Sequence, residues 1–171
     1  MEDIDIPTEH LHETIQEKSE EMHSAGGWFR FVAISTALMA VFAAISGLIA
    51  GHYSNEALID QIQASDQWSF YQAKGIKAEI KTLESKTGVA DVDAALKYKG
   101  EQQEIKKEAE KLQNESKAFL KKHVSLAQSV TLFQIAIAIS AISMLTKMKP
   151  LWIISLFISL AGIVFFIIGF V

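Results

Sequence analysis

The stretch that decides the fold is residues 31–55, FVAISTALMAVFAAISGLIAGHYSN. Its 25 residues include no Asp, Glu, Lys or Arg, and two more charge-free stretches occur at 123–146 and 150–171. A helix of a water-soluble domain needs a polar face, whereas the hydrocarbon core of a bilayer accepts roughly 20 apolar residues per helix. The sequence therefore predicts an all-α membrane protein with three transmembrane helices.

The composition excludes several classes of protein. The chain has no cysteine, which rules out disulfides, thiolate metal sites and cysteine catalysis. A net charge of −4 and a pI near 5.7 provide no basic surface for nucleic acid. The sequence has neither a glycine-rich phosphate loop nor an ordered set of Ser, His and Asp, so we expect no enzyme activity and no cofactor.

The acidic N-terminus, residues 1–27, does not have the pattern of a signal peptide. It contains eight acidic residues and a single lysine, whereas a signal peptide begins with positive charge. We therefore expect an acidic tail or a short helix over 8–24, followed by a first span that is retained. The histidines and glutamates of this tail lack the closed four-ligand set of a structural metal site, so no metal is expected. These residues are Glu9, His10, His12, Glu13 and His23.

The order of apolar and charged stretches divides the chain into six segments. Trp28 and Phe29 beside Arg30 are typical of a bilayer boundary. The five residues between the second and third spans can only reverse the chain, and Pro150 suits the first turn of the helix that follows. The segments are the N-terminal tail 1–27, transmembrane helix 28–53, charged middle 54–123, transmembrane helix 124–145, short loop 146–150 and transmembrane helix 151–171.

The charged middle segment is predicted to form a long antiparallel helical hairpin outside the membrane. It contains no proline, and it has twelve Lys against twelve Asp and Glu. Its strong break is Thr87-Gly88, with Asp91 as a candidate helix N-cap, which places the turn near 87–91. The arms on either side, 54–86 and 91–123, have equal lengths of 33 residues. Both arms are expected to continue into their spans without a break.

Hydrophobic spacing predicts that the two arms pair as a coiled coil. Large and small residues alternate in seven-residue repeats along the second arm. The first arm carries a stripe of isoleucine and leucine, interrupted at its centre by Asp66 and Ser69. The expected seam is Tyr98, Ile105, Leu112, Phe119 and Leu126 with Gln102, Ala109, Ser116 and His123 in the second arm, and Ile59, Ile62, Ala73, Ile76, Ile80 and Leu83 in the first.

An unusual run of residues in the first arm carries a resemblance to a known family. Asn55-Glu-Ala-Leu58 is followed by Ala64-Ser-Asp-Gln-Trp68, Tyr71-Gln-Ala-Lys74 and Ile76-Lys77. This ASDQW…YQAK…IK motif resembles an uncharacterised family of small bacterial membrane proteins, whose order of segments is similar along nearly the whole chain. The resemblance implies a multi-pass protein of the bacterial inner membrane and implies no catalytic activity.

Trp68, Tyr71 and Gly75 form a second face of the first arm, which Ala64 and Ala78 extend. These aromatic residues lie about 20 Å beyond the membrane end of a helix, too far to anchor it at the bilayer surface. We interpret this face as a subunit or partner interface. Two alternatives stay open: the aromatics complete the hairpin itself, or they line a ligand pocket.

Folding the hairpin about residue 89 places Gly75 and Gly100 at nearly the same height. Each glycine costs roughly 1 kcal/mol inside a helix, so the pair predicts a close approach of the helices or a shared kink. The same folding brings Asp66 near Lys107 and Lys111, where an ion pair across the seam would fix the register.

Small and polar residues mark candidate helix contacts within the spans. Small residues at four-residue spacing allow membrane helices to pack closely. Gln128 and Gln134 in the second span are expected to hydrogen-bond across helices rather than to line a pore. The small-residue ridges are Ala43, Gly47 and Gly51 on the first span and Ser155, Ser159 and Gly162 on the third.

The orientation is predicted from the positive charges beside the spans. Arg30, Lys147 and Lys149 favour a cytoplasmic N-terminus and short loop, which puts the hairpin in the periplasm, although Lys121 and Lys122 favour the opposite. We expect a non-enzymatic oligomeric scaffold or accessory subunit whose partners are a second copy, a membrane-protein complex and the lipid bilayer. The alternatives are an ion-conducting oligomer lined by the second span, including Ser140, and a signal-relay module.

Overall fold

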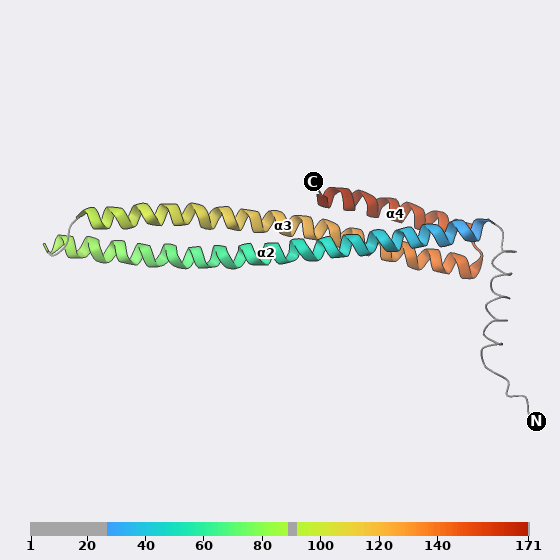
Figure 1. The fold of residues 1–171 in the computed structure, drawn as a ribbon, viewed down its shortest axis with the longest axis horizontal. Coiled ribbons are helices and arrows are strands. Elements are labelled where there is room, and N and C mark those ends of the chain that lie inside the picture. The colour runs from blue at the N-terminus through green and yellow to red at the C-terminus, as the bar shows by residue number, and fades with distance from the viewer. Residues whose placement is uncertain (1–26, 89–91, 171) are drawn as a thin grey trace, which may run out of the picture. The chain divides into compact units, whose positions relative to one another are not determined.

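The computed structural model describes residues 27–88 and 92–170. Within these ranges the chain forms three helices and no strand: α2 (Trp28–Lys86), α3 (Val92–Thr146) and α4 (Lys149–Phe170) (Figure 1). This confirms the all-α class. The predicted helix over 8–24, the histidines of the acidic tail and the candidate N-cap Asp91 lie outside the described residues.

All three helices are long and apolar enough to cross a membrane. The helix α4 has 22 residues, close to the length of a single span, whereas α2 has 59 and α3 has 55. Neither long helix has a break where its apolar stretch meets its charged stretch. The prediction that each arm continues directly into its span is therefore confirmed.

The two described turns are set by residues with left-handed backbone conformations. Gly88 has a φ of 76°, which costs glycine little because it lacks a Cβ, and this places the first break where the sequence predicted it. After α3, Lys147 takes up a φ of 56° without being glycine. Ser143 Oγ donates a 2.8 Å hydrogen bond to the carbonyl of Met148 and holds this second turn closed. Pro150 then lies in the first turn of α4, as predicted.

The described chain packs as two compact units, each with its own contacts. Among the described residues, unit 1 contains 27–44 together with Ser129–Ile163, and unit 2 contains 45–88 and 92–128 together with 164–170. In unit 2, α2 and α3 run antiparallel and side by side (Figure 1). Their backbones come close enough for side chains of α3 to bond directly to the backbone of α2. Ser116 Oγ donates a 2.7 Å hydrogen bond to the carbonyl of Ala57, and His123 Nδ1 donates a 2.8 Å hydrogen bond to the carbonyl of Ala50.

Alanines form the face of α2 that packs against α3 in unit 2. Ala50, Ala57, Ala64 and Ala78 recur at multiples of seven residues and are each at most 6% exposed. The facing positions of α3 include the buried Ala109, Leu112, Ser116 and Leu126, all of which belong to the seam predicted for the second arm. Small side chains on α2 opposite a mixture of large and small ones on α3 explain the close approach of the backbones.

The seam predicted for the first arm is wrong. Its isoleucines and leucine are between 47% and 63% exposed, and Ala73 is exposed as well. The prediction ranked positions by side-chain hydrophobicity. Burial is instead decided by how closely two backbones can approach, and that favours alanine. The exposed residues are Ile59, Ile62, Ala73, Ile76, Ile80 and Leu83.

The prediction that Gly75 and Gly100 lie at nearly the same height is confirmed, because Gly75 contacts Gln102, two residues from Gly100, but a close helix approach that involves both glycines is wrong. A Cβ added to Gly75 would lie 2.5 Å from Gln102 Nε2, so this glycine accommodates a side chain of α3. Nothing lies within 4 Å of a Cβ added to Gly100, which is exposed. The two glycines therefore differ: only Gly75 is required by the packing.

The core of unit 1 is apolar and centred on one aromatic ring. Phe133 is fully buried between Met39 and Ala136, and its ring stacks with that of Phe42 at 5.9 Å between centroids. Gly162 of α4 lies against the Phe133 ring, since a Cβ added there would be 3.2 Å from the nearest ring carbon. A glycine at this position lets α4 pack closely on the bulkiest residue of the core.

The two glycines of the paired arms provide a matched test of this packing. Replacing Gly100 with Ala should raise the free energy of unfolding by about 0.5–1 kcal/mol, because alanine is the better helix former and meets no neighbour. Gly75→Ala should gain nothing, because Gln102 must move and its hydrogen bond to the carbonyl of Tyr71 is lost. Thermal unfolding of both variants in detergent, followed by circular dichroism, measures the difference; equal stabilisation would contradict the close contact at Gly75.

Candidate interaction surface

Hydroxyl groups make polar contacts between helices in unit 1. Thr36 Oγ1 of α2 and Ser140 Oγ of α3 share a 2.6 Å hydrogen bond, and Trp152 Nε1 of α4 donates to Ser35 Oγ at 3.1 Å. Hydroxyl bonds of this kind hold apolar helices together where lipid provides no hydrophobic drive for association. Sequence reasoning missed them because it looked for amides at depth. The available signal was the seven-residue spacing of Leu126, Phe133 and Ser140, all of which are buried.

The predicted small and polar residues of the spans fall into a buried set and an exposed set. Ser155, Ser159 and Gly162 of α4 are buried inside unit 1. Gly47 and Gly51 are exposed, and nothing lies within 4 Å of a Cβ added to Gly51. The ridge on α4 is therefore used within the chain. On α2, Ala43 packs against the core around Phe133, whereas Gly47 and Gly51 stay open.

Gln128 and Gln134, the predicted intramembrane polar contacts, are both exposed on α3. Within residues 27–88 and 92–170 neither side chain makes a hydrogen bond. The hydroxyl groups described above provide the polar contacts between helices in unit 1. The two amides are thus available to groups outside the chain.

The aromatic face of the first arm lies beside α3 in unit 2. Trp68 and Tyr71 are half-buried and meet edge to face, with 5.4 Å between ring centroids. The carbonyl of Tyr71 accepts a 3.3 Å hydrogen bond from Gln102 Nε2, and Gly75 makes room for the same side chain. Tyr71 and Gly75 thus both contact α3. This arrangement is expected under the alternative in which the aromatic residues complete the pairing of α2 with α3. Contact between Trp68 and a partner stays a prediction.

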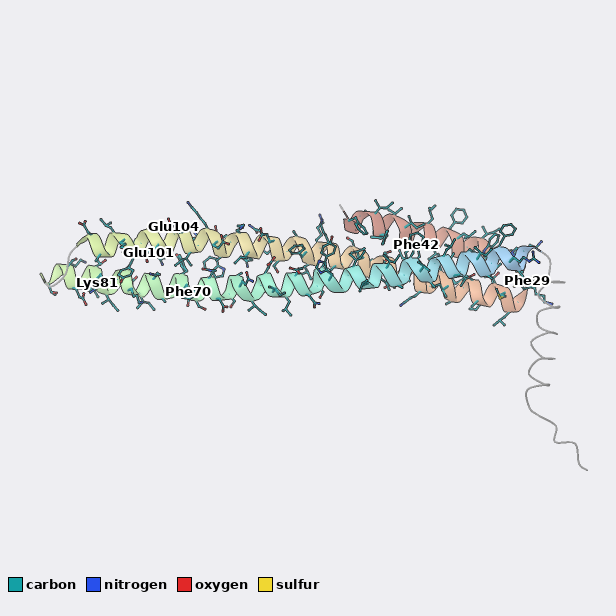
Figure 2. The ribbon with its side chains drawn as sticks, viewed as in Figure 1. Phe29, Phe42, Phe70, Lys81, Glu101 and Glu104 are labelled. Carbon is teal, nitrogen blue, oxygen red and sulfur yellow. The ribbon has the colours of Figure 1, made fainter. Side chains whose placement is uncertain are left out.

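One ion pair joins the two arms. Lys74 Nζ donates to Glu101 Oε2, and the same ammonium lies 5.1 Å from the ring centroid of Tyr98. The hydrogen bond from Lys74 lowers the pKa of the Glu101 carboxyl, and partial burial opposes that shift. Figure 2 shows Glu101 on α3 beside the α2 segment that carries Phe70 and Lys81. Lys81 pairs with Glu84 on its own helix, which raises the pKa of Lys81.

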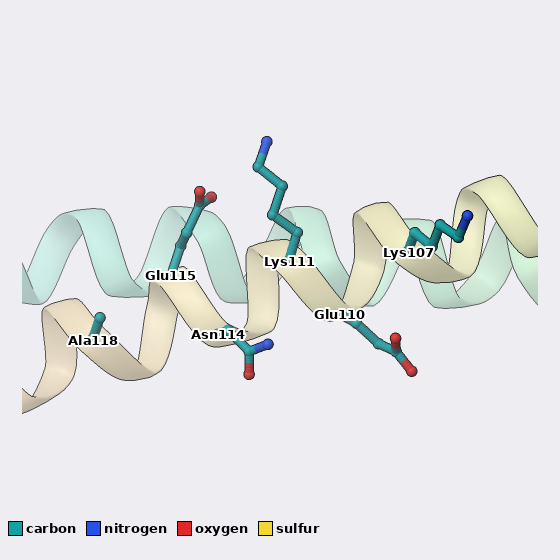
Figure 3. Close-up of a pocket in the computed structure, with 6 residues that line it drawn as sticks. All are labelled: Lys107, Glu110, Lys111, Asn114, Glu115 and Ala118. Atoms are coloured by element: carbon teal, nitrogen blue, oxygen red, sulfur yellow. The ribbon is translucent and has the colours of Figure 1, made fainter.

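The ion pair predicted between Asp66 and the lysines of α3 does not form. Asp66 is exposed, because it lies two residues beyond the buried Ala64 and so points away from α3. Lys111 is 3.6 Å from Glu108 on its own helix instead. Figure 3 shows Lys107, Lys111 and their neighbours on α3, where charges of both signs line an open hollow typical of a solvated surface. Lys74 and Glu101 fill the register role predicted for Asp66.

A long stripe of α2 is exposed throughout the described part of unit 2. We call it the outer stripe. It follows the alternating three- and four-residue spacing of a heptad repeat and lies on the side of α2 opposite the buried alanines. Its members in unit 2 are Ile45, Leu48, His52, Asn55, Ile59, Ile62, Asp66, Ser69, Ala73, Ile76, Ile80 and Leu83, all of them exposed.

Among the described residues no group of three or more His, Asp or Glu could hold a metal ion. The hollows they line are open and mostly charged or apolar at the surface of a helix pair. The features that remain are helix faces, on an all-α chain whose three helices are long and apolar enough to cross a membrane.

The chain belongs to the family described as "Domain of unknown function (DUF4337)", whose family model matches residues 28–171. The match covers α2, α3 and α4 together. The resemblance to an uncharacterised family is therefore confirmed. Comparisons with curated proteins and with solved structures gave no match.

The Lys74–Glu101 pair predicts a pH-dependent contribution to stability. Because folding lowers the pKa of Glu101, the pair stabilises the fold at pH values above the unfolded pKa of about 4.3 and loses this effect as the pH falls through the lower folded value. Glu101→Gln should therefore reduce the free energy of unfolding at pH 7 but not at pH 2. Denaturant titrations across this range measure the difference between wild type and variant.

Glu104→Gln is the matched control, since Glu104 is exposed on the same helix (Figure 2). It should lack the pH-dependent difference. A Glu101→Gln difference that stays constant from pH 7 to pH 2 would show that the carboxylate charge contributes nothing.

Proposed function

We propose that this protein is a non-enzymatic integral protein of the bacterial inner membrane, which acts as an oligomeric scaffold or accessory subunit. In this proposal the arms of α2 and α3 form a coiled-coil hairpin outside the bilayer. The observation that carries it is the continuity of α2 and α3, each of which joins an apolar span to a charged arm in one unbroken helix. Such helices present a binding surface at a fixed connection to the membrane.

The charges of the arms support their position outside the bilayer. Three ion pairs each join two partly exposed side chains of the same helix. Such pairs are common in water but costly in hydrocarbon. At 1.5 Å per residue, each arm would extend about 50 Å from the membrane. The pairs are Lys81 with Glu84, Lys106 with Glu110, and Lys111 with Glu108.

The proposed orientation places the N-terminus and the loop between α3 and α4 in the cytoplasm and the hairpin in the periplasm. Lys147 in that loop and Lys149 at the start of α4 are exposed, and Arg30 lies in the first turn of α2. Basic residues beside short loops favour the cytoplasmic side, while a segment longer than about 60 residues crosses with little regard to its charge.

A signal-relay module is the second candidate function, and the same continuity of α2 and α3 favours it. A shift or rotation of either helix at the membrane could reach the tip of the arm without passing through a break. The ion-conducting alternative has less support, because Ser140 is buried and bonded to Thr36 whereas Gln128 and Gln134 are exposed. These three side chains do not share one exposed face that could line a pore.

The scaffold proposal predicts self-association of the purified protein. Its detergent-corrected mass should correspond to two or more copies of the 18.9 kDa chain. The same preparation should show no conductance in a planar bilayer. The protein should also be purified from native membranes in mild detergent. A membrane-protein complex that co-purifies with it would show that it acts as an accessory subunit. A monomer over a wide concentration range, without such a complex, would contradict the proposal.

The proposed orientation predicts which single cysteines react in intact cells. Asn114→Cys on the exposed surface of α3 should react with a membrane-impermeant maleimide, whereas Lys147→Cys should react only after the inner membrane is permeabilised. The chain has no native cysteine to interfere. The reverse labelling pattern would place the hairpin in the cytoplasm and would leave the scaffold proposal intact.

A further inference from the structure

The outer stripe of α2 is apolar in a part of the chain that is otherwise strongly charged. Its large side chains in unit 2 are between 42% and 78% exposed. Apolar exposure needs no explanation where lipid surrounds the helix, but the residues from Ile59 onward belong to the arm that we propose lies in water. A long apolar surface in water marks an interaction site. The side chains that lie in this aqueous part are Ile59, Ile62, Ile76, Ile80 and Leu83.

The spacing of the outer stripe identifies the geometry of what covers it. Steps of three and four residues alternate without exception from Ile45 to Leu83, and this spacing presents a straight seam to a partner helix that runs nearly parallel to α2. In unit 1 the same alternation occurs at exposed residues closer to the N-terminus. These residues are Phe31, Ile34, Leu38 and Val41.

A second copy of this chain fits the outer stripe better than an unrelated partner. Copies of a membrane protein insert with one orientation, so their α2 helices point the same way and present identical seams at the same height. The stripe also runs without interruption from the apolar stretch of α2 into its charged arm. A partner must therefore also have an apolar stretch that suits lipid followed by a charged stretch that suits water. Another α2 helix has both in the same order, because the two copies are identical.

Polar residues within the stripe give the pairing its register. Asp66 and Ser69 occupy two successive seam positions and, with Phe70 and Ala73, line a hollow in the surface of α2. His52 and Asn55 occupy two others. Asn55 and Ser69 can each hydrogen-bond to the same side chain on a helix in register, whereas two Asp66 carboxylates at the same height repel each other and make the pair less stable.

We propose that this chain self-associates through a parallel coiled coil of its α2 helices, formed by the outer stripe on the side opposite the alanines that pack against α3. This inference rests on the proposed function and specifies its interface. It assigns each face of α2 one partner: α3 of the same chain on the alanine face, and α2 of another copy on the outer stripe.

Single-cysteine crosslinking of the full-length protein in lipid vesicles tests the proposal. In a parallel pair, identical positions meet, so Ile62→Cys, Ile76→Cys and Ile80→Cys should each form disulfide-linked dimers at least tenfold faster than controls. The controls are Gln61→Cys on α2 and Glu115→Cys on α3, which are exposed but lie off the stripe. Crosslinks no faster than these controls would overturn the proposal, and so would a fast crosslink at one stripe position alone, because that indicates antiparallel helices.

A charge introduced into the stripe provides an independent measurement. Ile76→Asp should weaken self-association at least tenfold, as measured by sedimentation in detergent, while Gln61→Asp should leave it unchanged. Both side chains are exposed within the chain, so circular dichroism should show unaltered helix content in either variant. The wild-type mass separates the two proposals. A multimer that Ile76→Asp does not weaken overturns the outer-stripe interface but leaves the scaffold standing. A wild-type monomer overturns the interface, and it overturns the proposed function as well if no membrane-protein complex co-purifies.

Discussion

The close approach of α2 and α3 is the interaction on which the rest of unit 2 depends. Ser116 Oγ and His123 Nδ1 reach backbone carbonyls of α2 only because alanine stands at the facing positions. A carbonyl is an acceptor, so the ring nitrogen of His123 must carry a proton, which fixes the tautomer of a neutral ring. A larger side chain at Ala50 or Ala57 would separate the helices and break both bonds. The seam is thus defined by small residues and completed by side chain to backbone hydrogen bonds.

That choice of seam determines what remains on the surface. With alanines toward α3, the opposite side of α2 must carry the larger side chains, and its isoleucines and leucines are left exposed. Lys74 and Glu101 lie at the edge of the seam, where they pair across the helices without being removed from water. The division into an alanine face and an isoleucine face lets one helix take two partners that do not compete.

Unit 1 uses a different means of packing. Its helices meet around Phe133. Hydroxyl groups of α2 and α3 and the indole N–H of Trp152 on α4 form bonds where apolar side chains alone would offer little preference for protein over lipid. Serine is small enough to let helices approach and polar enough to bond across them. The chain therefore uses small residues in both units, for hydrogen bonds to backbone in one and for hydroxyl pairs in the other.

The amino-acid sequence was enough to predict the class, the three apolar helices, the break at Gly88 and the seam of α3. These depend on local properties: charge-free length, glycine's tolerance of positive φ, and the repeat from Ile105 to Leu126. Which face of α2 meets α3 was decided only by the tertiary structure. Two stripes with heptad spacing coexist on that helix, and hydrophobicity alone favoured the isoleucines over the alanines. The distance between two backbones is a property of the pair, so neither helix reveals it separately. The roles of Gly100 and Asp66 were misassigned for the same reason, since both residues are exposed when the alanine face of α2 packs against α3.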